Sequence, residues 1–334
     1  MLTYEDFTVG TVLPMGPKTV TEAEIIAFAE KYDPQPFHTD PDSMMAAGVG
    51  GLIASGWHTC GIMMRMICDA YLLESASMGS PGLDEVRWLL PVRPGDTLTG
   101  TTTVLNRRIS KSRPELGLLT LQYELRNQRN ESVMITRGLG MMRIANPGIH
   151  PDSEGDVSGG FEESPITQGT AAADGGSGTS FYHLVQPGMM QEIGSCTFSA
   201  DEIIEFAREF DPQPFHLSQE AARKSHFGSL CASGWHTVSA WMRLNVLHGY
   251  KGLRDASGYK GGKPRLGASP GVRDIKWSHP VYAGDTVTFR STVTGKKPGK
   301  QDGWGIMTFH TEGFNQDGVQ VLAMDGAARM PVEG

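Results

Sequence analysis

Apolar residues recur at helical spacing in two segments of the chain, residues 22–32 (EAEIIAFAEKY) and 200–210 (ADEIIEFAREF). Thr21 and Ser199 stand directly before these segments, where a side-chain oxygen can cap the first turn of a helix. A proline follows shortly after each segment and cannot continue the helix. The pattern therefore predicts two short amphipathic helices of matching length.

The two halves of the chain are copies of one another. Residues 22–59 align without a gap on residues 200–237, at an offset of 178, and 19 of the 38 positions are identical. The hexapeptides DPQPFH and ASGWHT recur whole, and further on WLLPVRPGDT matches WSHPVYAGDT at an offset of 189. Eleven residues have therefore been inserted into the second copy. We expect them in the Gly- and Lys-rich segment 250–271, as an extended surface loop.

After ASGWHT, each copy continues with a longer apolar segment, at about residues 56–74 and 234–249. A helix that is apolar on nearly all sides is a buried one, so each is expected at the centre of its domain. The rest of the first copy has strand-like segments at about 85–90, 97–107, 116–127 and 132–145. In the second copy, Asp317 and Gly318 mark a hairpin. One buried helix and a run of antiparallel strands predict an α+β fold in which the sheet wraps round the helix.

The duplication predicts two domains, residues 1–150 and 181–334, which also suits the length of 334 residues. Residues 151–180 between them are poor in large apolar residues and rich in Gly, Ser, Thr and acids. That composition is typical of a flexible linker.

Composition and charge exclude several classes of protein. With 39% hydrophobic and 20% charged residues the chain is globular, and 29 basic against 37 acidic residues give a net charge of −8. This balance argues against nucleic acid or an anionic membrane as a partner. The four cysteines lack CxxC spacing, so neither a disulfide scaffold nor a metal site is expected. The first residues, MLTYEDFTVG, lack the pattern of a signal peptide, and no segment is apolar enough to span a membrane, so we expect a cytoplasmic protein.

The repeated DPQPFH carries the first candidate chemistry, the pairs Asp33 and His38 in one copy and Asp211 and His216 in the other. Residues five apart point about 140° apart in a helix and lie on opposite faces of a strand. The flanking prolines predict a rigid, non-helical loop that can aim both side chains at one point. A carboxylate and an imidazole at one point can hold a water molecule and remove a proton from it. The alternative is that Asp ends a turn and His is a hydrogen-bonded core residue.

The repeated ASGWHT places Gly56 and Gly234 at the start of the long helices. Free N–H groups and the positive end of the helix dipole can there stabilise a developing oxyanion, although the glycine can equally serve close packing. His58 and His236 lie inside the helices, and we expect structural hydrogen bonds for them in the core. Ser55 lacks the first glycine of a GxSxG elbow, which disfavours a serine nucleophile.

In both copies, DPQPFH resembles the hydratase signature of the MaoC-like dehydratases and R-specific enoyl-CoA hydratases. The resemblance covers nearly the whole chain apart from the linker and the insertion, and it implies a tandem, or double, hotdog fold. It further implies that the two Asp–His pairs are catalytic and that Gly56 and Gly234 form oxyanion holes. Gln35 and Gln213 stand where the family usually has Asn. This departure bears on substrate preference more than on the reaction.

The implied reaction is reversible hydration of a trans-2-enoyl-CoA to an (R)-3-hydroxyacyl-CoA, with an acyl-CoA as the partner and no cofactor beyond the CoA of the substrate. A hotdog acyl-CoA thioesterase is the nearest alternative, and a non-catalytic acyl-CoA sensor is a third. A homodimer is also possible for such a chain. Binding of the CoA phosphates needs local cations, and a solvated strand end explains the same clusters equally well. The candidates are Arg107, Arg108, Lys111 and Arg113, with Lys296, Lys297 and Lys300 in the second copy.

Overall fold

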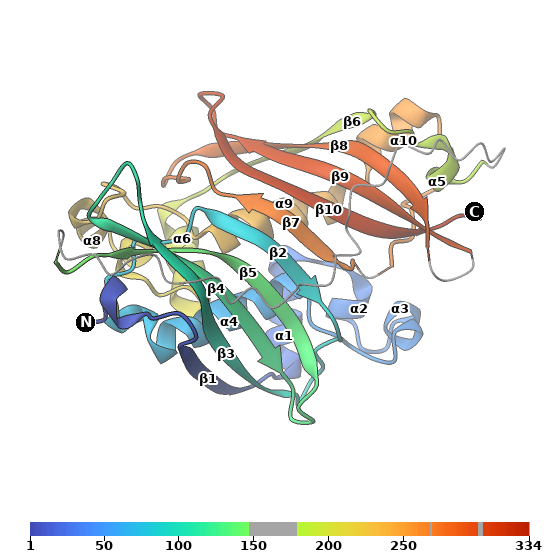
Figure 1. The fold of residues 1–334 in the computed structure, drawn as a ribbon. Coiled ribbons are helices and arrows are strands. Elements are labelled where there is room, and N and C mark those ends of the chain that lie inside the picture. Colours follow the sequence, from blue (N-terminus) through green and yellow to red (C-terminus); the bar gives the residue numbers. More distant parts are fainter. Residues whose placement is uncertain (147–178, 268, 300–302, 334) are drawn as a thin grey trace.

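The computed structural model describes residues 1–146, 179–267, 269–299 and 303–333, and its strands form one antiparallel sheet (Figure 1). The strand order is β1-β3-β4-β5-β2-β7-β10-β9-β8-β6. The first copy supplies β1 (Val12–Thr19), β2 (Gly82–Trp88), β3 (Thr97–Ile109), β4 (Leu116–Arg126) and β5 (Ser132–Arg143). The second copy supplies β6 (Met190–Thr197), β7 (Gly271–Lys276), β8 (Thr286–Pro298), β9 (Trp304–Phe314) and β10 (Gln320–Pro331).

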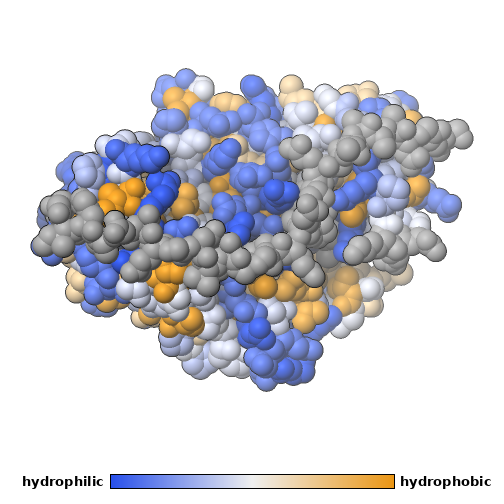
Figure 2. All heavy atoms as spheres, viewed as in Figure 1, coloured by the Kyte–Doolittle hydropathy of each residue, from blue (hydrophilic) through white to orange (hydrophobic). Residues whose placement is uncertain are grey.

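The two copies join edge to edge at the middle of this sheet. β2 pairs with β7, with Leu83 opposite Ile275 and Val86 opposite Val272. The strand order on one side of this junction repeats on the other, so an approximate twofold relation links the copies. On the sheet face shown in Figure 2, hydrophilic residues lie over the middle strands.

The helices form a layer against the other face of the sheet (Figure 1). The two long buried helices, α4 and α9, begin at Gly56 and Gly234, and both packed copies follow the predicted α+β arrangement. The first copy contains η1 (Tyr4–Asp6), α1 (Glu22–Tyr32), α2 (Pro36–Thr39), α3 (Met44–Gly48), α4 (Gly56–Ala70) and η2 (Leu72–Glu74). The second contains α5 (Phe181–Leu184), α6 (Ala200–Phe210), α7 (Pro214–Leu217), α8 (Gln219–Lys224), α9 (Gly234–His248) and α10 (Lys251–Ser257).

The predicted amphipathic helices are confirmed, and both begin with a capping box. In α1, Thr21 accepts a hydrogen bond from the Glu24 backbone while the Glu24 side chain accepts from the Thr21 backbone. Ser199 and Glu202 do the same in α6. Each box satisfies two N–H groups that the helix itself leaves without a partner.

The edge strands β1 and β6 are absent from the sequence prediction. β1 reads VLPMGPKT, whose two prolines break the alternation that marks a strand. Proline is tolerated at a sheet edge because one side of the strand needs no donors, and β1 and β6 are the two outermost strands.

The insertion in the second copy is only partly the surface loop that its composition predicts, because residues 258–267 are irregular and largely exposed while the residues before them are helical. Residues Lys251–Ser257 form α10, and both Tyr250 and Leu253 are buried. They pack with Phe181, Phe309 and neighbouring residues in a separate apolar cluster. Burial of these two side chains overrides the loop-forming glycines around them. The predicted linker, residues 151–180, lies outside the described residues except for its last two positions.

Contacts between the copies also follow the twofold relation. The Arg65 guanidinium of α4 donates to the Arg208 carbonyl at the end of α6, and Arg243 of α9 donates to the Lys31 carbonyl at the end of α1. Cations stabilise the carbonyl end of a helix, so each central helix holds the amphipathic helix of the other copy.

His58 and His236 are core residues, as predicted, but ring stacking replaces the predicted hydrogen bond. His58 stacks on Phe28 with ring centroids 4.8 Å apart, and His236 stacks on Phe206 at 4.7 Å. Neither Nδ1 atom has a hydrogen-bond partner among the described residues. Burial lowers the pKa of His58 to about 4 and that of His236 to about 3, because a charged imidazole would lose its hydration.

Candidate active site

Each DPQPFH segment contains a single helical turn, which corrects the prediction of a wholly non-helical loop. Pro36 begins α2 and Pro214 begins α7, so each histidine lies on a helical turn and each aspartate lies before it. The second proline starts the turn because the first helical position needs no N–H donor and favours the φ of proline. The turn brings the two side chains together, as the motif predicted.

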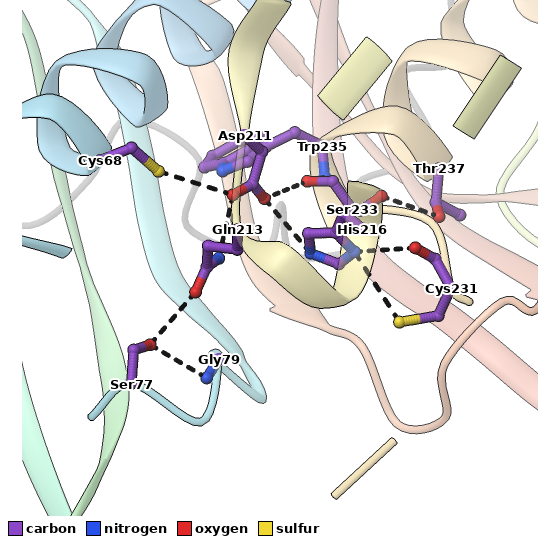
Figure 3. Close-up of polar contacts among 10 residues, drawn as sticks. All are labelled: Cys68, Ser77, Gly79, Asp211, Gln213, His216, Cys231, Ser233, Trp235 and Thr237. Atoms are coloured by element: carbon purple, nitrogen blue, oxygen red, sulfur yellow. Dashed lines mark hydrogen bonds and ion pairs between the residues drawn. The ribbon is translucent and has the colours of Figure 1, made fainter. Parts of the chain in front are cut away.

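In the second copy, Asp211 and His216 face one another inside the protein (Figure 3). The His216 Nε2 atom lies 3.5 Å from Asp211 Oδ2, and the two residues are 6% and 3% exposed. That separation is longer than a good direct hydrogen bond, yet both atoms can contact one water molecule.

The Nδ1 atom of His216 lies 2.7 Å from the carbonyl oxygen of Cys231. A carbonyl oxygen only accepts, so Nδ1 donates and carries a proton. In the neutral imidazole Nε2 is then an acceptor directed toward the carboxylate. The backbone around Cys231 therefore determines which nitrogen faces the site.

Two side chains that the sequence analysis did not assign hold the carboxylate of Asp211 (Figure 3). Ser233 donates its hydroxyl to Oδ2 at 2.6 Å, and Gln213 donates its amide to Oδ1 at 2.9 Å. The signal was present, because both residues belong to the repeated hexapeptides. Ser233 also caps α9 by accepting from the Trp235 N–H, and no hydrogen bond joins it to His216 among the described residues. The serine therefore orients the acid and is not activated as a nucleophile.

Residues of the first copy complete this network. The Ser77 hydroxyl donates to Gln213 Oε1 at 3.3 Å, and the Cys68 thiol lies 3.7 Å from Asp211 Oδ1. Burial and the nearby Asp211 carboxylate raise the pKa of the Cys68 thiol, which keeps it protonated as a donor.

A cavity of about 450 Å³ lies beside Asp211 and His216, between the two copies. Its volume is in the range typical of small-molecule sites. Its polar end contains Asp211, Gln213, His216, Ser233 and Gly234. The apolar walls come largely from the first copy and include Met63, Met64, Ile67, Leu119, Leu121 and Met142.

Gly234 lines the cavity at the start of α9, and its N–H has no hydrogen bond with any described residue. A Cβ atom at this position would collide with the ring of Trp277, as one at Gly56 would collide with Trp88. The glycine is thus required for packing, and its free N–H is also available to a ligand oxygen.

The first copy keeps the same internal geometry around Asp33 and His38. The His38 Nε2 atom lies 3.4 Å from Asp33 Oδ2, Ser55 donates to that oxygen at 2.6 Å, and Gln35 donates to Oδ1 at 2.8 Å. The residues of this pair do not line the 450 Å³ cavity.

The structure separates the predicted phosphate-binding cations into two groups. Arg107 is buried, donates to the Phe7 carbonyl and lies over the Tyr4 ring. Lys296, its counterpart, is buried against Tyr182 in the same way. These two cations fasten the start of each copy to the sheet, and their burial does not suit phosphate binding.

Arg113 does reach the cavity, and its side chain is exposed there. Burial lowers the pKa of the adjacent His226, and the positive charges of Arg113 and Arg143 lower it further. Arg143 was not a predicted candidate. Arg108 and Lys111 are exposed, Lys297 is partly buried, and Lys300 lies outside the described residues.

Sequence comparison identifies the family. A family model described as "MaoC like domain" matches residues 8–122 and 184–312, one segment in each copy. The chain belongs to the MaoC-like domain family. Its dehydratase members are related to enoyl-CoA hydratases. An uncharacterized protein of Bacillus subtilis (strain 168), YdeM, is 28% identical over 129 residues, which cover 39% of this chain and 90% of that protein.

Solved structures confirm the double hotdog fold. A putative MaoC domain protein dehydratase from Chloroflexus aurantiacus has a TM-score of 0.78 at 20% identity, covering 99% of this chain and 98% of that one. A conserved hypothetical protein from Mycobacterium tuberculosis, described as a double hotdog, has a TM-score of 0.71 at 16% identity and covers 98% of both chains. At these identities the likeness establishes the fold, and the chemistry must be argued from the site.

The described residues contain neither a membrane-spanning helix nor a cluster of metal-ligating side chains. No helix among them is long and apolar enough to cross a membrane. In the same part of the chain, no group of three or more His, Cys, Asp or Glu side chains is placed to hold a metal ion.

Proposed function

We propose that the protein reversibly hydrates a trans-2-enoyl-CoA to an (R)-3-hydroxyacyl-CoA. The observation that carries this proposal is the pairing of Asp211 and His216 at the polar end of a largely apolar cavity. Addition of water needs a base that holds and deprotonates the water, and a pocket beside that base that binds the acyl chain. Membership of the MaoC-like family, whose dehydratases are related to enoyl-CoA hydratases, supports the same reaction class.

In the proposed reaction, one water molecule lies between Asp211 Oδ2 and His216 Nε2 and donates a hydrogen bond to each. Asp211 takes a proton as the water oxygen forms its bond to C3 of the enoyl thioester. His216 keeps the water oriented because the Cys231 carbonyl fixes its Nδ1–H. Ser233 and Gln213 keep the carboxylate in place. The general-base contribution is of the order of 10² to 10⁴ in rate.

Attack at C3 moves electrons onto the thioester oxygen and creates an enolate. The free N–H of Gly234, at the positive end of α9, can donate to this oxygen. Collapse of the enolate then takes a proton at C2 from the same Asp–His pair, so water has been added across the double bond with no change of oxidation state. Because the water oxygen and the proton arrive from one side, the addition is syn.

The nucleotide part of CoA would lie at the open end of the cavity, where Arg113 is exposed and Arg143 is close to the same histidine. These guanidinium groups are suited to phosphate oxygens. Such local charge can bind the anion in a protein with a net charge of −8.

The test is a panel of trans-2-enoyl-CoAs of different chain length and branching, read by mass spectrometry for a gain of one water. Hydration appears as loss of enoyl absorbance without release of free CoA thiol, whereas a thioesterase would release thiol from saturated acyl-CoAs. The double variant Asp33→Asn/Asp211→Asn should lose turnover while retaining its circular dichroism spectrum. Full hydratase activity in that folded variant would refute the proposal.

A further inference from the structure

We infer that each chain has one working site, the Asp211–His216 pair, and that the intact Asp33–His38 pair is structural. This inference rests on the proposed function and goes beyond it, because the two motifs are identical in sequence. Their surroundings differ, since each site is completed by residues of the other copy. The twofold relation allows the two sites to be compared position by position.

The first difference is on the central helices. Met63 of α4 lines the 450 Å³ cavity together with Trp235. The residue of α9 that corresponds to Met63, at the offset of 178, is Trp241. Trp241 packs edge-on against Trp57 at 6.1 Å, and Trp57 packs against Trp88 at 5.2 Å. An indole is bulkier and more rigid than a thioether chain. Trp241 thus occupies the space in the first copy that Met63 leaves open in the second.

The second difference is on the sheet. Leu119, Leu121 and Met142 line the cavity beside Asp211. β9 and β10 of the second copy are equivalent to β4 and β5 of the first, and their registers match. The residues equivalent to the three wall residues are therefore Met307, Phe309 and Met330. None of these three residues lines the 450 Å³ cavity, and all three belong to the apolar cluster around the insertion.

The inserted segment fills that second space. Tyr250 and Leu253 are buried in the cluster, and the Tyr250 ring lies 5.6 Å from that of Phe309. At the first site, the inserted side chains therefore pack against Met307, Phe309 and Met330. At the second site, the equivalent residues face the cavity instead. An acyl chain cannot enter without displacing this packing, and core packing tolerates such displacement poorly.

The third difference concerns the polar network. Ser77, which donates to Gln213, corresponds to Leu266 at the offset of 189, and Cys68, which lies against Asp211, corresponds to Val246. The first pair therefore lacks both of the donors that reach the second pair from the other copy. Asp33 still accepts hydrogen bonds from Ser55 and Gln35, which tie α1 to the start of α4. That structural role accounts for an intact motif without turnover.

Matched single variants test the inference once an enoyl-CoA substrate has been found. Asp211→Asn should lower kcat by at least roughly 10²-fold, while Asp33→Asn should stay within about twofold of the wild type. The unhydratable saturated acyl-CoA of the same chain length should bind with one molecule per chain. If each single variant removes about half of the activity, or if two molecules bind per chain, the inference is wrong. A wild type that hydrates no member of the panel would instead count against the proposed function.

A second matched pair keeps the test decisive if Asp33→Asn fails to fold. Met63→Trp places in the second site the indole that fills the first, and it should lower kcat/KM at least tenfold. Trp241→Met makes the reciprocal change and should leave kcat within about twofold. Circular dichroism and thermal unfolding check that both variants are folded. Unchanged activity in folded Met63→Trp would overturn the assignment of the cavity as the acyl site.

Discussion

Replacing Ser233 or its counterpart Ser55 by alanine separates the structural from the catalytic role of the same hydrogen bond. Each hydroxyl is buried, donates to an aspartate oxygen at 2.6 Å and caps a central helix by accepting from the N–H two residues on. The alanine removes the donor and the cap without adding volume. The two substitutions therefore remove the same hydrogen bonds, although only Ser233 lines the cavity.

The expected loss of stability follows from these two contacts. A hydrogen bond to a charged group contributes about 1.5–3 kcal/mol, and loss of a helix N-cap costs about 1 kcal/mol. Ser55→Ala and Ser233→Ala should thus each lower the free energy of unfolding by about 2.5–4 kcal/mol. Only Ser233→Ala should affect turnover, because Ser233 orients the aspartate at the cavity. A loss of about 1.4 kcal/mol in that orientation corresponds to a tenfold decrease in kcat.

Urea unfolding followed by circular dichroism measures the first effect, and the decrease of enoyl absorbance under saturating substrate measures the second. Ser233→Thr, which keeps a hydroxyl, is the conservative control and should recover part of kcat. Equal losses of kcat in Ser55→Ala and Ser233→Ala would refute the reasoning on catalysis. A Ser55→Ala variant as stable as the wild type would refute the reasoning on stability.

Three further predictions use other parts of the molecule. Burial depresses the pKa of His58 and His236 below 6.5, so the unfolded chain binds more protons than the folded chain as the pH falls. The free energy of unfolding should therefore decline below about pH 6.5, by roughly 2 kcal/mol per histidine at about pH 5. Urea unfolding at each pH should show a smaller decline in the variant His58→Phe/His236→Phe. Arg113→Ala should raise KM for the acyl-CoA several-fold and weaken its dependence on salt, with kcat nearly unchanged in steady-state assays; an unchanged KM would remove Arg113 from the phosphate site. Gly234→Ala should destabilise the protein by about 1–3 kcal/mol in thermal unfolding, because its Cβ would meet the Trp277 ring, and an undiminished melting temperature would contradict this packing.

The local elements were predictable because their signals are local. The helices at residues 22–32 and 200–210 are defined by apolar periodicity and by a capping residue three positions before a glutamate. The aspartate and histidine of each DPQPFH were also recognisable, since six consecutive residues, two of them prolines, contain the whole turn. β1 was not recognisable, because its prolines are tolerated only at the edge of a sheet. Which strand lies at the edge depends on the strand order, which the local sequence does not show.

The roles of the cations needed the structure for a similar reason. Arg107 and Arg113 lie six residues apart in one basic segment, yet one is buried over Tyr4 and the other is exposed at the cavity. Both arginines belong to the same run of basic residues, so the charge pattern of the sequence does not distinguish them. The sheet pairing and the packing of the chain start decide which cation faces solvent.

The duplication, the central helices and the repeated aspartate and histidine could be predicted from the amino-acid sequence, since each depends on residues that are close together along the chain. The packing of the folded chain places Asp211 and His216 at the 450 Å³ cavity and keeps Asp33 and His38 away from it. The walls of each site come from the other copy, through positions such as Met63 and Trp241 that are far from the motifs in sequence. Open volume is a property of the side chains that meet in space, and two identical hexapeptides cannot encode a difference between their neighbours.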